Sequence, residues 1–91
     1  MKKEIIYIDL DGVVVDYYGA ANGLTYEETH AKGFFENLKP LENSIEAVKT
    51  LMKRFDVYFA STAPWTNVYS WMEKRMWLER YFEDLAFKNL F

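Results

Sequence analysis

The stretch IIYIDLDGVVVD, residues 5–16, decides how this chain folds, because it runs an apolar segment into two carboxylates and a glycine. A short apolar run that ends at a turn signal is typical of a fully buried parallel strand, so we predict a strand over residues 4–10. Asp9 and Asp11 stand at its carboxyl end, where open α/β sheets bind ligands. Residues i and i+2 of a strand share a face, so the two acids can converge on a cation or a phosphate.

The Asp-Gly pair at the end of this stretch leaves a second interpretation open. Asp-Gly between apolar runs is a strong signal for a β-hairpin, and the valines of residues 13–15 could form the returning strand. A fragment of a calcium-binding loop is disfavoured, because such a loop needs oxygen ligands where this chain has Val13 and Val15. The residue pattern alone leaves both the strand end and the hairpin possible.

The composition indicates a single folded domain over residues 1–91. Hydrophobic residues make up 51% of the chain and aromatic residues 19%, which disfavours disorder. The formal net charge is −3 and the basic residues are interspersed with acids, which argues against a nucleic-acid polymer as partner. Cysteine is absent, and no apolar run suits a signal peptide or a membrane span. We therefore expect a cytoplasmic protein whose metal ligands, if any, are oxygens.

Beyond the first stretch the chain alternates helical and strand patterns. Asn43 with Glu46 at the third helical position, followed by an apolar stripe, predicts a capped helix over residues 44–54. Residues 57–61 are typical of a second buried strand. The order strand, helix, strand implies a right-handed crossover and a parallel pair.

A second, longer helix is predicted after the second strand. It is expected over residues 67–82, and one side of it would carry Val68, Trp71, Met72, Leu78 and Phe82. Residues 85–91 are apolar enough to begin a third strand.

A small polar insert, residues 16–43, separates the first strand from the helix over residues 44–54. Thr25 followed by Glu28 has the spacing of a capping box and predicts a short helix from Thr25 to about residue 32. His30 is the chain's only histidine and is expected to be a surface residue of this insert.

Three segments of the chain, in this order, resemble a known enzyme family. They are Asp9-Leu10-Asp11-Gly12-Val13, Gly33-Phe34-Phe35-Glu36-Asn37-Leu38 and Ser61-Thr62-Ala63-Pro64-Trp65. Together they resemble the haloacid dehalogenase-like (HAD) phosphohydrolase superfamily, and within it the 5'(3')-deoxyribonucleotidase-like group. The resemblance implies an α/β fold, a truncated HAD-like Rossmannoid three-layer arrangement around a parallel sheet. Residues 16–43 would form a short helical cap insert over the active site.

The same resemblance implies a phosphomonoester hydrolase that depends on Mg²⁺. Asp9 would be the nucleophile that forms an aspartyl-phosphate, and Asp11 would be the general acid and then the general base. Because a carboxylate attacks an anionic phosphate poorly, Mg²⁺ held by the Asp9 carboxylate and the Asp11 carbonyl is expected to neutralise charge. Ser61 and Thr62 would hold the phosphoryl oxygens.

Three aromatic residues are candidates for the substrate pocket: Phe34, Phe35 and Trp65. Stacking of a base on an aromatic ring contributes roughly 1 to 3 kcal/mol. From the residues alone, the same side chains could equally belong to the core. Because the resembled enzymes act on nucleotides and the cap insert is short, we expect a nucleoside monophosphate to bind in a rather open pocket.

The chain departs from the resembled family in its second half. The family's third motif supplies a lysine and its fourth motif supplies further acids for Mg²⁺, but Lys88 and Asp84 do not match them in position. We therefore expect weak Mg²⁺ binding. The first strand would also lack a neighbour, which predicts a homo-oligomer formed through the exposed sheet edge. The alternative function is a weakly active or inactive half-domain that acts as a binding or assembly module.

Overall fold

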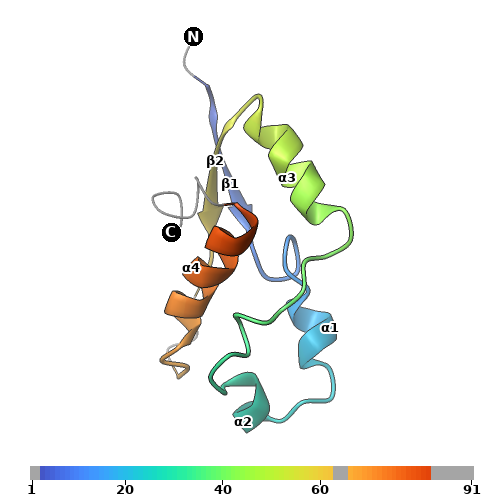
Figure 1. Ribbon diagram of the computed structural model, residues 1–91, viewed down its shortest axis with the longest axis vertical. Helices are drawn as coiled ribbons and strands as arrows, with labels where there is room; N and C mark the ends of the chain where they lie inside the picture. The colour runs from blue at the N-terminus through green and yellow to red at the C-terminus, as the bar shows by residue number, and fades with distance from the viewer. Residues whose placement is uncertain (1–2, 63–65, 83–91) are drawn as a thin grey trace.

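The computed structural model describes residues 3–62 and 66–82. Within these ranges the secondary structure comprises β1 (Ile5–Asp9), α1 (Tyr17–Ala21), α2 (Tyr26–Thr29), α3 (Ser44–Met52), β2 (Asp56–Ala60) and α4 (Ser70–Tyr81). β1 and β2 are parallel, with Ile5 opposite Asp56 and Asp9 opposite Ala60, and α3 connects them (Figure 1). The prediction of an α/β chain with a parallel strand pair is confirmed. The third strand predicted over residues 85–91 lies outside the described residues.

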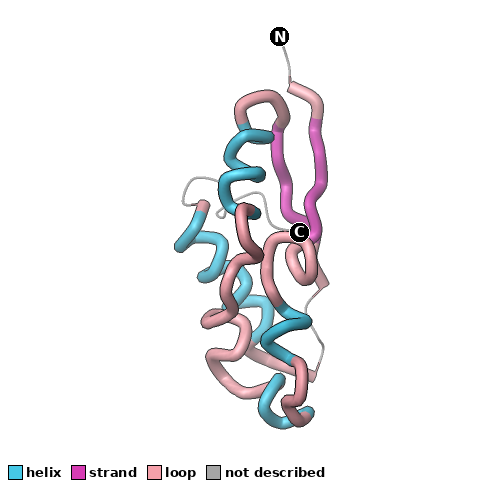
Figure 2. Tube along the Cα trace, turned by 90° about the vertical axis from the view of Figure 1, so that its right-hand side faces the viewer, coloured by secondary structure: helices cyan, strands magenta, loops and turns pink. Residues whose placement is uncertain are grey.

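Helices cover one face of the two-stranded sheet, and the other face is largely bare in the described part of the chain. Figure 2 shows α3 and α4 on the same side of the strands. Val57 and Phe59 of β2 point into this layer and are 1% and 0% exposed. Ile5 and Tyr7 of β1 are 51% and 63% exposed, so the prediction of a fully buried first strand is wrong. The third layer and association through the sheet edge stay predictions.

The chain makes a tight loop directly after β1. The backbone N–H groups of residues 13–15 all donate to the Leu10 carbonyl, at 3.2, 2.9 and 2.8 Å, and the Gly12 N–H donates to the Val15 carbonyl. Gly12 has φ 81, a conformation that glycine adopts without steric cost. Val14 and Val15 are buried in the core. The hairpin interpretation is therefore wrong, because residues 13–15 form this loop and Val14 and Val15 enter the core instead of pairing back along β1.

α4 presents a different face to the core from the predicted one. Its buried side chains are Ser70, Glu73, Lys74, Trp77 and Leu78. The predicted core residues Val68, Trp71 and Met72 are 83%, 45% and 53% exposed, whereas the predictions for Leu78 and Phe82 are confirmed. The observed stripe has helical spacing but contains two charged side chains, so hydrophobicity alone selects the wrong face. None of the described helices has the length and apolar character that a membrane span requires.

Of the two predicted capping boxes, the one at the start of α2 forms and the one at the start of α3 does not. The capping box of α2 is confirmed: Thr25 Oγ1 accepts from the Glu28 N–H at 3.2 Å, and Glu28 Oε1 accepts from the Thr25 N–H at 3.2 Å. Asn43 does precede α3, but it has φ 65 and its side chain makes no capping hydrogen bond. Because this left-handed conformation turns the side chain away from the first turn, the predicted capping box with Glu46 is wrong.

The α2 end of the insert over residues 16–43 is hydrogen-bonded to the chain that follows β2. His30 Nε2 lies 2.9 Å from Thr66 Oγ1, and the His30 ring stacks on Tyr26 with 3.8 Å between centroids. Asn67 Nδ2 also donates to the Thr29 carbonyl at 3.5 Å. His30 was predicted to be a surface residue of the insert; the structure shows that it is half-buried and hydrogen-bonded.

The hydrogen bond between Trp77 and Leu38 provides a test of the α4 orientation. Trp77 Nε1 donates to the Leu38 carbonyl at 2.7 Å in the core. We expect Trp77→Phe to lower the free energy of unfolding by about 2 kcal/mol, because it removes this bond and leaves a cavity. Trp71→Phe on the exposed face is the control and should change it by less than about 0.5 kcal/mol. Urea denaturation measures both, and equal losses would contradict the observed orientation.

Candidate active site

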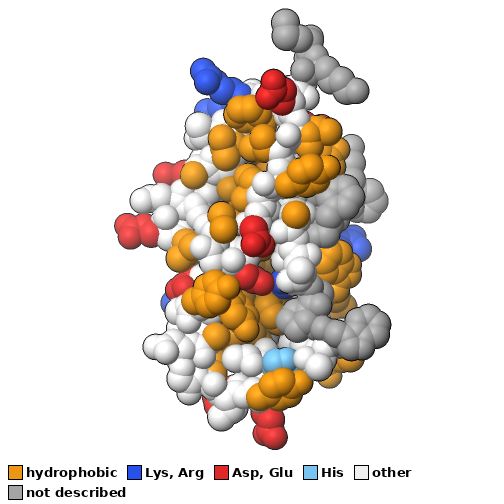
Figure 3. All heavy atoms as spheres, turned by 180° about the vertical axis from the view of Figure 1, so that it is seen from behind, with side chains coloured by type: hydrophobic (Ala, Val, Ile, Leu, Met, Phe, Trp, Pro, Cys, Tyr) orange, Lys and Arg blue, Asp and Glu red, His pale blue; other side chains and the backbone are white. Residues whose placement is uncertain are grey.

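The carboxyl ends of β1 and β2 bring the predicted site residues to one edge of the sheet. Asp9 ends β1, and Ser61 and Thr62 follow β2 directly. A cavity of about 250 Å³ opens there, lined by Asp9, Asp11, Tyr17, Tyr18, Phe35 and Thr62. A second hollow of about 300 Å³ is lined by Asp9, Ala60, Ser61 and Thr62. The strand side of the molecule carries acidic side chains among hydrophobic ones near its middle (Figure 3).

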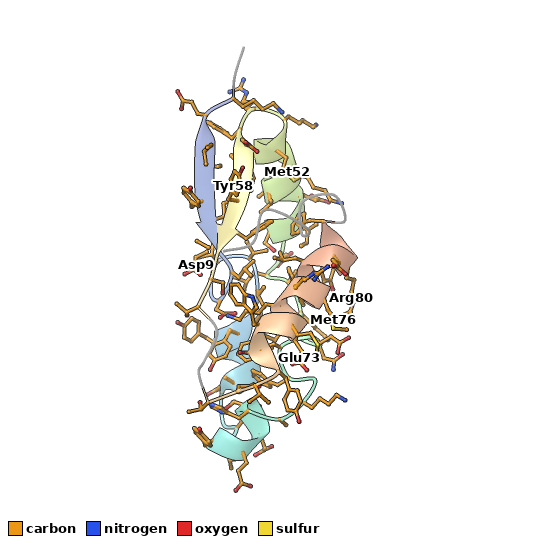
Figure 4. The ribbon with its side chains drawn as sticks, turned by 90° about the vertical axis from the view of Figure 1, so that its left-hand side faces the viewer. Asp9, Met52, Tyr58, Glu73, Met76 and Arg80 are labelled. Atoms are coloured by element: carbon orange, nitrogen blue, oxygen red, sulfur yellow. The ribbon has the colours of Figure 1, made fainter. Side chains whose placement is uncertain are left out.

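Asp9 lies at the end of β1 with an exposed carboxylate (Figure 4). Its Oδ1 accepts a hydrogen bond from the Leu10 backbone N–H at 2.7 Å. Among the described residues it belongs to no ion pair. The backbone therefore orients one carboxylate oxygen, while the carboxylate as a whole stays accessible from both hollows.

Asp11 forms an ion pair with Lys74, a residue that was not predicted at the site. Lys74 Nζ donates to Asp11 Oδ2 at 2.8 Å, and the two side chains are 3% and 23% exposed. The same ammonium donates to Ser61 Oγ at 2.7 Å and to the Thr62 carbonyl. Lys74 thus connects the loop after β1 to the loop after β2.

The sequence contained one signal for this lysine. The buried side chains of α4 have the spacing of one helical face: Ser70, Glu73, Lys74, Trp77 and Leu78. The neighbouring face is more hydrophobic, so hydrophobicity pointed to that face instead. A buried lysine on such a face must have acceptors for its ammonium group. The polar residues after β2 are natural acceptors, since α4 begins just beyond them.

The aromatic residues predicted for the pocket, Phe34, Phe35 and Trp65, do not all line the cavity. Phe35 is 3% exposed and lines the cavity, and its ring stacks on Tyr17 with 5.9 Å between centroids. Phe34 packs edge-on against both rings and is not among the residues lining the two hollows. Trp65 lies outside the described residues. The predicted pair of adjacent aromatics therefore has one member on the cavity wall and one behind it.

Two cavity residues, Tyr17 and Tyr18, were missing from the predicted site. They follow the loop after β1 directly, and their rings meet edge-on at 5.3 Å. Tyr18 is 71% exposed, and its ring lies so close to Gly12 that a Cβ there would be 2.6 Å from Tyr18 Cε2. The glycine thus lets the Tyr18 ring lie against the backbone that carries the acids. Their position directly after the Asp-Gly loop was the available sequence signal.

The oxygen donors at this edge fit a magnesium ion that keeps much of its water shell. The described residues contain no group of three or more His, Cys, Asp or Glu side chains placed to hold a metal. Asp9 and Asp11 are the two acids present, and the Asp11 carboxylate already accepts from Lys74. Mg²⁺ is commonly bound by one or two carboxylates together with water and substrate phosphate. Asp9 therefore has the accessible carboxylate at this edge.

The chain is similar to two viral proteins. It is 41% identical over 96 residues to a protein of Vibrio phage KVP40 named "Putative 5'(3')-deoxyribonucleotidase", an alignment covering 97% of this chain and 56% of that protein. It is 34% identical over 91 residues to an uncharacterized protein of Acanthamoeba polyphaga mimivirus, covering 91% of this chain and 50% of that protein. The chain spans about half the length of these curated relatives. No protein-family model matches it.

The different environments of the two acids predict different effects on stability. Asp11→Ala should lower the free energy of unfolding by about 2 to 3 kcal/mol, because it removes the carboxylate partner of the buried Lys74 ammonium. Asp9→Ala should cost less than about 1 kcal/mol, because Asp9 is exposed and makes one backbone hydrogen bond. The double variant Asp11→Ala/Lys74→Met should recover part of the loss. Chemical denaturation of the variants measures this, and equal effects of the two single changes would contradict it.

Proposed function

We propose that this chain is a nucleotidase-like phosphatase of HAD type that hydrolyses nucleoside monophosphates. The observation that carries the proposal is the convergence of Asp9, Asp11, Thr62 and Lys74 at the carboxyl edge of two parallel strands. The name of the similar phage protein supports a nucleotide as substrate. The chain spans about half of that protein, so the proposal for this chain rests on the residues that its own site brings together.

The proposed reaction passes through an aspartyl-phosphate on Asp9. A carboxylate oxygen of Asp9 attacks phosphorus, and the bond between phosphorus and the ester oxygen breaks. Once the phosphoryl group replaces Asp11 as an acceptor of the Lys74 ammonium, Asp11 would carry a proton, and it gives this proton to the leaving alkoxide, which departs as the nucleoside. Water then attacks the aspartyl-phosphate, Asp11 takes a proton from it, and inorganic phosphate leaves with Asp9 regenerated. The hydrogen bond from the Leu10 N–H keeps the Asp9 carboxylate oriented for the attack.

Lys74, Ser61 and Thr62 would bind the phosphoryl group. The ammonium of Lys74 lies between the two strand ends, where it can offset the negative charge of the phosphoryl oxygens. Phosphate would replace one of its present acceptors. Bound Mg²⁺, held by Asp9 and the Asp11 carbonyl, would add further charge neutralisation. Lys74 would therefore supply a positive charge at the phosphate that was not predicted from the sequence.

The aromatic wall of the cavity provides a surface for the nucleoside. Tyr17, Tyr18 and Phe35 line the same cavity as Asp9 and Asp11, so a substrate with its phosphate at the acids would have aromatic faces beside it. The exposed position of Tyr18 fits the open pocket expected for a short cap insert.

Phosphate release tests the proposed function directly. With Mg²⁺ present, we expect the chain to release phosphate from deoxyribonucleoside monophosphates and from p-nitrophenyl phosphate, and EDTA to abolish this. Asp9→Asn should lower turnover by at least about a thousandfold, because the amide is not a nucleophile. Asp56→Asn, an acid at the opposite end of the sheet, is the matched control and should leave turnover unchanged. Turnover that persists in Asp9→Asn would overturn the proposal.

The role of the lysine can be tested separately. Lys74→Met keeps most of the apolar stem but removes the charge, so it should lower kcat/KM for both substrates by about a hundredfold to a thousandfold. Arg75→Met removes a neighbouring cation that pairs with Glu79 on the exposed side of α4, and it should leave kcat/KM within about twofold. If both variants behave alike, the charge of Lys74 does not contribute at the site.

A further inference from the structure

Glu73 is a buried acid that the proposed mechanism does not use. It precedes Lys74 on α4, where Figure 4 labels it. The Glu73 residue is 1% exposed. Its Oε2 accepts a hydrogen bond from the Gly33 backbone N–H at 2.6 Å, and its Oε1 has no hydrogen-bond partner among the described residues. Burying a carboxylate with so few partners is costly. The contact with Gly33 is therefore the feature of Glu73 that calls for a functional explanation.

Both backbone polar groups of Gly33 are hydrogen-bonded. While its N–H donates to Glu73, its carbonyl accepts from Asn37 Nδ2 at 2.8 Å and from the Asn37 backbone N–H at 3.1 Å. Gly33 has φ 90, a conformation that side-chain-bearing residues rarely adopt. The two peptide groups that meet at Gly33 are thus oriented by one hydrogen bond to Glu73 and two from Asn37.

The fixed peptide leads directly to the cavity wall. Phe35, two residues beyond Gly33, lines the cavity beside Asp9 and Asp11. Lys74 Nζ lies 5.0 Å from the centroid of the Phe35 ring. Consecutive residues of α4 therefore hold the cap insert at two points, Glu73 at Gly33 and Lys74 at Phe35.

Two further contacts attach the same part of the cap insert to α4, but they lie farther along the helix. Trp77 Nε1 donates to the Leu38 carbonyl at 2.7 Å, and Arg80 Nη1 donates to the Glu36 carbonyl at 3.2 Å. Because these contacts secure the segment beyond Phe35, loss of the Glu73 contact would free the Gly33 end while the segment as a whole stays attached.

We infer that Glu73 is a positioning residue that sets the cap-side wall of the substrate cavity through Gly33 and Phe35. It does not touch the reacting atoms. It acts on binding of the nucleoside portion of the substrate, and Lys74 beside it acts at the phosphate. This inference rests on the proposed function, since it names the residue by which the cap insert selects a nucleotide over a smaller phosphate ester.

Comparison of two substrates tests the inference. In Glu73→Ala we expect KM for a deoxyribonucleoside monophosphate to rise about tenfold, and the preference for it over p-nitrophenyl phosphate to fall about tenfold. Glu73→Gln keeps a carbonyl acceptor for the Gly33 N–H and should retain the wild-type preference within about twofold. Glu79→Ala, an exposed glutamate of the same helix, is the matched control and should also retain it. Equal loss on both substrates in Glu73→Ala would make Glu73 merely structural and overturn the inference.

Hydrogen exchange at the Gly33 amide provides a readout independent of activity. We expect exchange at least about tenfold faster in Glu73→Ala than in the wild type, and near wild-type exchange in Glu73→Gln. Unchanged exchange in Glu73→Ala would overturn the inference while leaving the proposed function standing. Absence of turnover in the wild type with slow Gly33 exchange would instead overturn the proposed function and the substrate role together.

A second variant guards against failure of Glu73→Ala to fold. Asn37→Ala removes the exposed contact on the other side of the Gly33 peptide without disturbing the buried carboxylate. It should shift the substrate preference in the same direction, by about twofold to threefold. A preference unchanged in Asn37→Ala, with Gly33 exchange accelerated, would show that the peptide does not set the cavity wall.

Discussion

The buried ammonium of Lys74 is the constraint on which the site and much of the fold depend. A charge that is 3% exposed needs acceptors, and Lys74 finds them in Asp11 after β1 and in Ser61 and Thr62 after β2. Meeting all three requires α4 to cross the edge where the parallel strands end. The cap insert then follows α4, through contacts of Glu73 with Gly33 and of Trp77 with Leu38. The arrangement that satisfies one cation also places Phe35 against Lys74, on the wall of the cavity beside the acids.

Local sequence patterns correctly predicted those elements that depend on residues close to one another along the chain. The strand pair, α3 and the capping box at Thr25 each follow from apolar periodicity or from a polar residue at a helix start. The orientation of α4 could not be predicted in this way, because Glu73 and Lys74 are buried by partners far away in the chain. Asn43 is a second example. Its spacing to Glu46 suits a capping box, but its backbone is left-handed and its side chain makes no capping hydrogen bond.

The candidate site also contains residues that the sequence predicted and residues that it did not. That Asp9, Asp11, Ser61 and Thr62 would meet follows from the parallel order of the strands, because the carboxyl ends of neighbouring parallel strands share an edge. The other walls of the cavity come from packing between distant segments, which spacing does not reveal. Phe34 and Phe35 illustrate this, since adjacent rings in one segment face different sides and only the packing against Tyr17 and Lys74 decides which one reaches the cavity.

The two-point contact of Glu73 and Lys74 with the cap insert bears on how this chain can vary in length. One residue inserted between Ser70 and Glu73 would turn the following side chains by about 100° around the helix axis, and both contacts would be lost together. Gly23, by contrast, lies exposed between α1 and α2 with no atom within 4 Å of the position where a Cβ would stand. Insertions at that connection would extend the insert away from the acids. Length variation is therefore tolerable at the tip of the insert and excluded in the first turn of α4.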